Sequence, residues 1–148
     1  MPKSSSSYLF PDINVWVALS YERHIHHSAA RRWFDRCDAN VLICFCRFTQ
    51  LGLLRLLTTN AVMGQDGVLS QAEAWRLYDR WYEDGRVLFL EEPVLLEPQF
   101  RILTQDVRPA PKDWADAYLA AFATATGLRL VTFDRSFGTK LREVDLLH

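Results

Sequence analysis

Short apolar runs that alternate with helical segments are the feature that most constrains how this chain folds. Each run is three to six residues in which aliphatic and aromatic side chains predominate, as they do in buried strands. The runs lie at 8–10, 41–45, 86–90 and 128–133. Strands that alternate with helices indicate a parallel sheet with helices on both faces. The sequence therefore predicts an α/β fold of three layers, α/β/α, around a mostly parallel sheet.

The helices between these runs carry start and stop signals. Ser70 and Glu73 form the capping-box pattern of a helix that we expect to run to about residue 84. Asp113 and Gly127 are placed as the N-cap and the C-terminal stop of another helix. Further helices are expected from residue 15 onward, over 26–37, over 49–58 and over 94–104, the last interrupted by Pro98, and the tail at 144–147 is expected to add an edge strand.

Length and composition favour a single domain. The 148 residues are 49% hydrophobic and contain no internal repeat or linker, so we expect one domain over 8–148 behind a disordered lead at 1–7. No apolar run approaches the roughly 20 residues that span a bilayer, and the polar N-terminus lacks a signal-peptide core. We therefore expect a cytoplasmic protein with no membrane partner.

The three cysteines, Cys37, Cys44 and Cys46, are expected to be reduced and mostly buried, because an odd number does not suit a disulfide framework. A zinc site that combines them with the histidines at 24–27 lacks the usual ligand spacings. A net charge of −1 excludes a general electrostatic attraction of the protein to a polyanion. A nucleic-acid substrate therefore has to be bound by local positive charges. The candidate phosphate contacts are Arg31, Arg32, Arg36, Arg47, Arg55 and Arg135.

Three aspartates fall where ligands gather in a parallel α/β fold. Asp12 follows the first strand, Asp134 follows the strand at 128–133, and Asp116 lies in the first turn of a helix that starts at the same edge. Carboxylates ~6 Å apart repel by roughly 3 kcal/mol per pair, so such a cluster calls for a cation. A hard ion, Mg²⁺ or Mn²⁺, suits these oxygen ligands and the hydrolysis of phosphodiesters. Each aspartate also has a local role that needs no metal, as an N-cap, a dipole partner or a turn residue.

At these residues the sequence resembles the PIN-domain family, and within it the VapC-type toxins of bacterial toxin–antitoxin pairs. The matching parts are 9–19, His24 with His27, 30–33, 48–57, 116–121 and 130–137. The resemblance implies a metal-dependent endoribonuclease, the toxin component of a type II pair, with Asp12, Asp116 and Asp134 as the acids and Asn14 and Thr132 as polar neighbours. It also implies an RNA substrate, a homodimer and a cognate antitoxin whose C-terminal segment lies over the acidic crevice.

Gln50 is the main departure from the family pattern, because PIN domains commonly carry a glutamate in this helix. An amide oxygen can coordinate an ion or hold a water but brings no charge, so we predict one well-occupied metal and modest activity. Gln50 also keeps open a non-catalytic alternative, a PIN-like module that binds RNA or a partner without cutting. Asp113 shares a helix face with Asp116 but is expected to cap the helix rather than bind metal.

A protein that forms an aspartyl-phosphate is a further alternative. A phosphatase of that kind needs an Asp-x-Asp after the first strand, and position 14 is Asn. A receiver domain needs a lysine close to the aspartate, and Lys140 is the one lysine near a strand end. Both features disfavour this alternative.

Overall fold

A computed structural model describes residues 8–148; the lead expected at 1–7 lies outside them. The described chain contains a five-stranded sheet in the order β3-β2-β1-β4-β5, and every pairing in it is parallel. The strands are β1 (Tyr8–Pro11), β2 (Leu42–Phe45), β3 (Val87–Phe89), β4 (Arg129–Thr132) and β5 (Val144–Leu146). The four expected runs are therefore strands, and the tail is an edge strand, as the sequence predicts.

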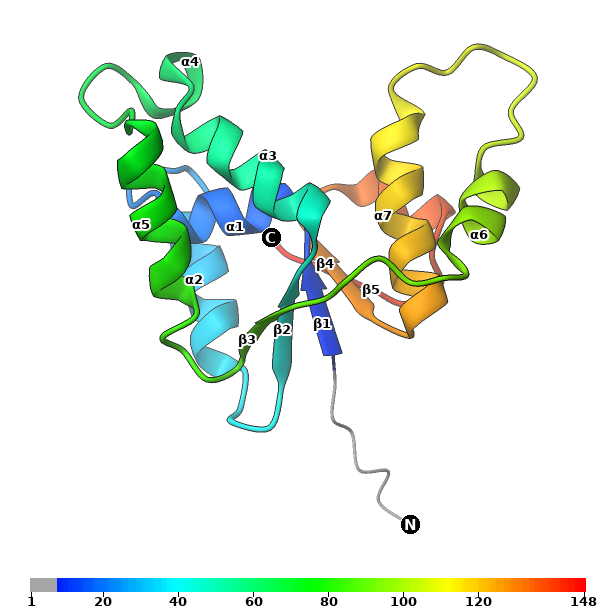
Figure 1. The fold of residues 1–148 in the computed structure, drawn as a ribbon, viewed down its shortest axis with the longest axis horizontal. Coiled ribbons are helices and arrows are strands. Elements are labelled where there is room, and N and C mark those ends of the chain that lie inside the picture. Colours follow the sequence, from blue (N-terminus) through cyan, green and yellow to red (C-terminus); the bar gives the residue numbers. More distant parts are fainter. Residues whose placement is uncertain (1–7) are drawn as a thin grey trace.

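Helices connect the strands in the alternation that the sequence predicts (Figure 1). They are α1 (Ile13–Ser20), α2 (His27–Arg36), α3 (Arg47–Leu57), α4 (Asn60–Met63), α5 (Gln71–Trp81), α6 (Leu96–Leu103) and α7 (Asp113–Thr126), with a 3₁₀ helix η1 (Arg135–Thr139) after β4. The short elements α4 and η1 are absent from the sequence-based prediction, since neither is long enough to show a helical period.

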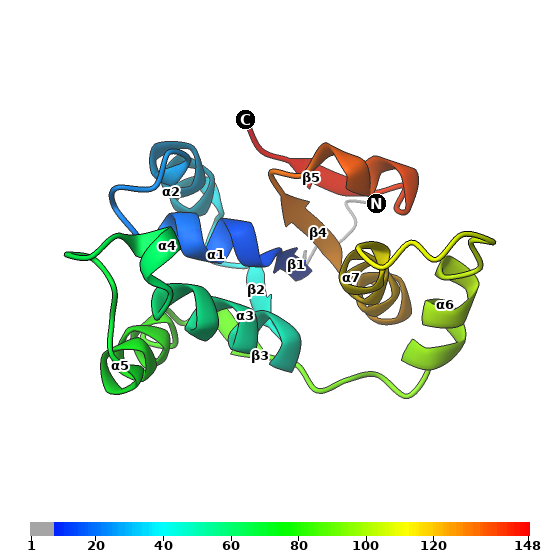
Figure 2. The same cartoon turned by 90° about the horizontal axis from the view of Figure 1, so that it is seen from above.

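The two faces of the sheet are buried in separate cores, which gives three layers. Consecutive strand residues point to opposite faces, so Leu9 packs with α1, α2, α3 and α5, whereas Phe10 packs with α6, α7 and η1. Viewed from above, the sheet runs between these two sets of helices (Figure 2). The α/β/α prediction is confirmed, and the sheet is wholly rather than mostly parallel.

The observed helices differ from the sequence-based prediction at three points. The capping box of Ser70 and Glu73 is present, with hydrogen bonds of 3.1 and 3.0 Å, but the helix ends at Trp81 instead of residue 84. Pro98 does not interrupt α6, because it lies in the first turn, where a missing N–H costs nothing. Asp113 is the first residue of α7 and not its cap. Gly127 ends that helix at φ 70°, the left-handed conformation that glycine adopts freely.

The strand order places a topological switch point between β1 and β4. The chain builds β1, β2 and β3 toward one edge and then crosses to build β4 and β5 toward the other. Ligands of open α/β sheets bind at such a point, outside the carboxyl ends of the strands. The order also differs from the 2-1-3-4-5 order of receiver domains, which argues against the aspartyl-phosphate alternative.

Two smaller predictions can be compared with the described residues. All three cysteines are free thiols, with Cys44 and Cys46 buried and Cys37 half-buried. Among residues 8–148, no helix combines the length and the apolarity needed to cross a bilayer.

Candidate functional site

Asp12 lies directly after β1, at the switch point, and its carboxylate is almost fully buried. Its backbone N–H donates to the carbonyl of Val131 at 2.8 Å, which continues the pairing of β1 with β4. One carboxylate oxygen accepts from the N–H of Ile13 at 2.7 Å, so Asp12 is also the N-cap of α1. Only 9% of the residue is exposed, and among the described residues no basic side chain forms an ion pair with it.

The buried hydroxyl of Thr132 joins two of the predicted acids. It donates to the second oxygen of Asp12 at 2.9 Å and accepts the backbone N–H of Asp134 at 3.0 Å. The side-chain amide of Asn14 also approaches this hydroxyl, at 3.4 Å. A hydroxyl has one donor position and two acceptor positions, so every hydrogen-bonding position of the Thr132 hydroxyl is occupied. The polar neighbours that the resemblance implies therefore surround the end of β4.

Asp134 and Asp116 each leave carboxylate oxygens free. Asp134 caps η1, and one of its oxygens accepts the N–H of Ser136 at 2.9 Å. Asp116 lies in the first turn of α7, is half-buried, and has no hydrogen bond or ion pair within residues 8–148. In Figure 1 this end of α7 stands at the same edge of the sheet as the start of α1.

The three carboxylates share one electrostatic environment. Burial raises the pKa of Asp12 to about 6, against the hydrogen bonds from Thr132 and Ile13, and the charges of Asp116 and Asp134 raise it further. The pKa of Asp116 is raised by burial and then by the charge of Asp134. Since Coulomb interactions fall with distance, Asp116 and Asp134 lie within electrostatic range of Asp12, and Asp134 lies within electrostatic range of Asp116.

These acids fit a hard divalent cation without already forming a closed ligand set. Carboxylate oxygens are the ligands that Mg²⁺ and Mn²⁺ prefer, and Asp12 has a buried charge with no basic partner to neutralise it. Within residues 8–148, however, no three His, Cys, Asp or Glu side chains stand close enough together to hold an ion as they are. Repulsion between uncompensated carboxylates opposes closer approach.

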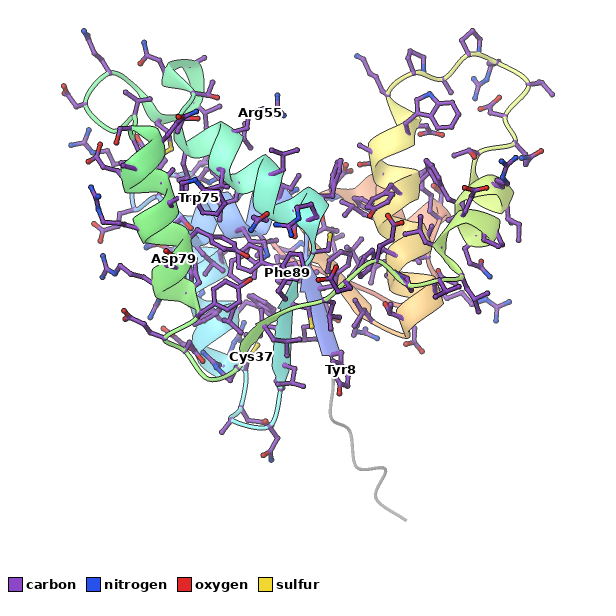
Figure 3. All side chains as sticks on the ribbon, in the orientation of Figure 1. Tyr8, Cys37, Arg55, Trp75, Asp79 and Phe89 are labelled. Carbon is purple, nitrogen blue, oxygen red and sulfur yellow. The ribbon has the colours of Figure 1, made fainter. Side chains whose placement is uncertain are left out.

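Gln50 lies in a different polar network. The residue is buried in α3, and its side-chain oxygen accepts from the guanidinium of Arg47 at 2.6 Å. Burial raises the pKa of Tyr78 on α5, while hydrogen bonds with Tyr82 and Gln50 lower it. Arg47 also stacks over Phe89, which Figure 3 marks beside the end of β3, with 4.8 Å from its guanidinium carbon to the ring centroid. No hydrogen bond of Gln50 in the described chain reaches one of the three aspartates.

Asp113 is held by a basic partner that the sequence analysis does not assign. Lys140, at the end of η1, forms an ion pair with Asp113 at 3.3 Å, and its side chain is only 16% exposed. Its charge also lowers the pKa of Asp116, against burial and the charge of Asp134. Lys140 thus ties η1, which Asp134 caps, to the first turn of α7, which carries Asp116.

A family model and several known proteins match the chain. The model of the PIN domain matches residues 9–140. The chain belongs to the PIN-domain family. Ribonuclease VapC41 of Mycobacterium tuberculosis is 46% identical over 132 residues, which are 87% of this chain and 90% of that protein. Ribonuclease VapC38 of the same species is 32% identical over 123 residues, 83% of this chain and 82% of that protein. The PIN domain is therefore of the VapC type.

Solved structures of other VapC proteins share the fold. One is VapBC2 from Rickettsia felis, bound to a DNA fragment from its promoter. The match covers 95% of this chain and 99% of that chain, with a TM-score of 0.68 and 11% sequence identity. VapC20 of Mycobacterium tuberculosis, a toxin that cleaves the sarcin–ricin loop, covers 88% and 93% at a TM-score of 0.63 and 19% identity. At these identities the likeness concerns the three-layer PIN fold alone.

Lys140 is the site residue that sequence reasoning missed. Five residues lie between it and Asp134, and the sequence points to it only as a possible partner of a phosphorylated aspartate. The signal was weak because η1 is a 3₁₀ helix of five residues with no apolar period. The six candidate arginines are all exposed; Arg31 pairs with Asp35 at 3.3 Å, and Arg47 bonds Gln50.

Replacing Lys140 tests its electrostatic effect on Asp116. Lys140→Met keeps the length of the side chain but removes its charge, so the pKa of Asp116 should rise, whereas Lys140→Arg should leave it nearly unchanged. Carboxyl ¹³C NMR titration of the metal-free protein measures both. An unchanged Asp116 pKa in Lys140→Met would show that the ammonium group does not act on this carboxylate.

Replacing Gln50 separates a structural role from a metal-binding one. Gln50→Ala removes the acceptor of the exposed Arg47 guanidinium, while Tyr78 keeps its hydrogen bond with Tyr82, so unfolding should become easier by about 0.5–1.5 kcal/mol while Mn²⁺ affinity stays unchanged. Urea denaturation and calorimetry measure the two quantities. Gln71→Ala, at an exposed position on α5, is the control and should change neither. A large loss of Mn²⁺ affinity in Gln50→Ala would return Gln50 to the ligand set.

Proposed function

We propose that this PIN domain is an endoribonuclease that depends on a divalent cation and acts as the toxin of a type II toxin–antitoxin pair. The observation that supports the proposal is the buried carboxylate of Asp12 at the switch point, which has no basic partner among the described residues and whose pKa the charges of Asp116 and Asp134 raise further. The three acids lie after β1, in the first turn of α7 and after β4, and Asp12 has no basic partner within residues 8–148. A bound cation would neutralise this negative charge.

The three acids have different parts in this proposal. Asp12 and Asp116 hold Mg²⁺ or Mn²⁺, and Asp134 orients the attacking water or contributes to a second ion position. The cation supplies charge for a phosphate oxygen and lowers the pKa of a water. Thr132 keeps the Asp12 carboxylate in place through its 2.9 Å hydrogen bond. Burial excludes solvent from Asp12, which strengthens its attraction for a cation.

The choice of RNA as substrate rests on the relatives. VapC41 and VapC38 are named ribonucleases, and VapC20 is described as cleaving the sarcin–ricin loop. The near-neutral net charge of this chain favours local contacts with the phosphates, and exposed Arg135 follows Asp134 directly. The scissile strand therefore lies across the end of β4 in the proposed complex.

An antitoxin and a second copy of the chain are the proposed protein partners. Solved VapBC structures from Rickettsia felis and from Salmonella typhimurium support an antitoxin partner for this VapC-type chain. An arginine or lysine of such a partner would satisfy the carboxylates that otherwise bind the cation. Leu51 on α3 is 62% exposed and Trp75 on α5 is 47% exposed, and both line a groove of about 410 Å³, which supports an apolar contact there.

Cleavage of RNA by acid-site variants tests the proposed function. Asp12→Asn and Asp116→Asn should each lower Mn²⁺-dependent cleavage by at least about a hundredfold, the order of loss for a charge that acts on the transition state. Asp79→Asn, on the exposed side of α5 in Figure 3, is the matched control and should retain full activity. The assay follows a labelled RNA in Mn²⁺ and in EDTA.

The same assay distinguishes the non-catalytic alternative. A PIN-like module would bind the RNA, leave it intact in Mn²⁺, and bind it equally well after Asp12→Asn. Cleavage that persists in EDTA or in both acid variants would also contradict the proposal.

The raised pKa of Asp12 predicts a characteristic dependence of stability on pH. Its folded pKa of about 6 lies above the ordinary 3.8, so ionisation of Asp12 costs stability. This cost is absent below about pH 4, grows as the pH rises to about 6, and reaches on the order of 3 kcal/mol above it. In EDTA at pH 7.5, Asp12→Asn should therefore melt at a higher temperature than the wild type.

Addition of Mn²⁺ should reverse that order. A cation that binds only the folded state stabilises it by mass action, so the wild type should gain melting temperature in Mn²⁺ and Asp12→Asn should not. Differential scanning fluorimetry from pH 4 to pH 8, with and without Mn²⁺, measures both effects. Equal Mn²⁺ stabilisation of the two proteins would remove Asp12 from the ligand set.

A further inference from the structure

A row of three aromatic rings begins next to the acids. The His26 ring lies flat against the Phe133 ring, with 4.3 Å between centroids and 16° between planes. The His24 ring follows, 5.7 Å from that of His26 and tilted by 41°. All three residues are half-buried, so each keeps part of its surface in contact with solvent. The row joins the loop between α1 and α2 to the end of β4.

Phe133 anchors this row at the candidate site. It stands between Thr132, which bonds Asp12, and Asp134. Its backbone N–H lies 3.5 Å from the side-chain oxygen of Asn14, a further polar neighbour of the acids. A strand whose scissile phosphate lies on these acids must carry a flanking nucleotide past the adjoining residues. The row of rings therefore starts in the same backbone segment as two residues of the candidate site.

The loop that carries the two histidines is held by its own hydrogen bonds. The backbone N–H of His24 donates to the carbonyl of Tyr21, and that of His27 to the carbonyl of His24, both at 3.0 Å. The His27 ring bonds the carbonyl of Ala18 at 2.7 Å and so ties the start of α2 to α1. A platform that is ordered before binding loses little entropy when a ligand stacks on it.

The histidine rings have hydrogen-bonding capacity to spare. Nδ1 of His24 accepts the backbone N–H of His26 at 3.0 Å, so the proton of a neutral His24 ring resides on Nε2 as a donor. No ring nitrogen of His26 has a hydrogen-bond partner among residues 8–148. Burial, and then the charges of His26 and His27, lower the pKa of His24, which favours the neutral ring.

We propose that Phe133, His26 and His24 form a stacking platform for an unpaired RNA base that flanks the cleaved bond. The proposal rests on the proposed ribonuclease function and names the class of substrate that the site takes, a single-stranded segment. Proteins that bind unpaired RNA stack its bases on aromatic and histidine rings. Arg23, in the same loop, and Arg135, two residues after Phe133, are exposed and have no ion pair in the described chain, so both are available to the adjoining phosphates.

Binding of a short RNA without cleavage tests the platform. The probe is a fluorescein-labelled single-stranded RNA with one 2-aminopurine, and EDTA prevents metal-dependent cleavage. His26→Ala should raise Kd about tenfold, the order expected for one lost stacking partner, and should reduce the quenching of 2-aminopurine. His26→Tyr keeps a ring at this position and should restore both.

Control variants separate stacking from folding. Tyr8→Ala removes an exposed aromatic side chain from the start of β1, the end of the strand away from Asp12, and should leave Kd unchanged. Phe133→Leu keeps an apolar side chain in the core but removes the ring, so it should weaken binding as His26→Ala does. Thermal melting of each variant reports whether the fold is kept, and weaker binding at an unchanged melting temperature assigns the loss to the missing ring.

The outcomes decide the platform and the proposed function independently. Wild-type Kd and wild-type quenching in both His26→Ala and Phe133→Leu would overturn the platform, even if Mn²⁺-dependent cleavage is intact. An equal loss of affinity for a double-stranded RNA of the same sequence would also overturn it, because paired bases offer no free face. Ring-dependent binding in a protein that cleaves no RNA would support the platform and contradict the proposed activity.

Discussion

The parallel pairing of β1 with β4 is the constraint on which the candidate site depends. It sets Pro11 beside Val131, and the next residue of β1, Asp12, continues the pairing through a hydrogen bond to the carbonyl of Val131. Thr132 then bonds Asp12 across a separation of 120 residues. Because the chain leaves β1 toward one edge and returns to β4 on the other side, this pair also marks the switch point. Helix α7 enters at the same edge and adds Asp116.

The same arrangement makes the metal-free site costly. Burial of Asp12 without a basic partner raises its pKa to about 6, and the charges of Asp116 and Asp134 oppose its ionisation. Lys140 offsets part of this repulsion at Asp116, where its charge lowers the pKa, and it fastens η1 to α7. Lys140 compensates only part of the repulsion between these carboxylates, and the remaining repulsion favours the binding of a cation. The proposed nuclease function depends on that cation.

The polar residues that the sequence assigns to the site belong to two separate hydrogen-bond networks. Thr132 and Asn14 belong to the acid site, as the resemblance to PIN domains implies. Gln50, which stands where PIN domains commonly carry a glutamate, accepts a hydrogen bond from Arg47 of the same helix, and its part in the acid site stays a prediction. Arg47 and Gln50 are three residues apart on α3, so sequence spacing can indicate this contact.

The sequence by itself determined the α/β class, the parallel sheet and the placement of Asp12, Asp116 and Asp134, because apolar periods, caps and strand ends are local signals. Only the tertiary structure decided what those residues meet. The pairing of Lys140 with Asp113 and the stacking of His26 on Phe133 join segments that are distant along the chain. No local pattern encodes such contacts, since they depend on which strands are neighbours and on how each helix is rotated against the sheet.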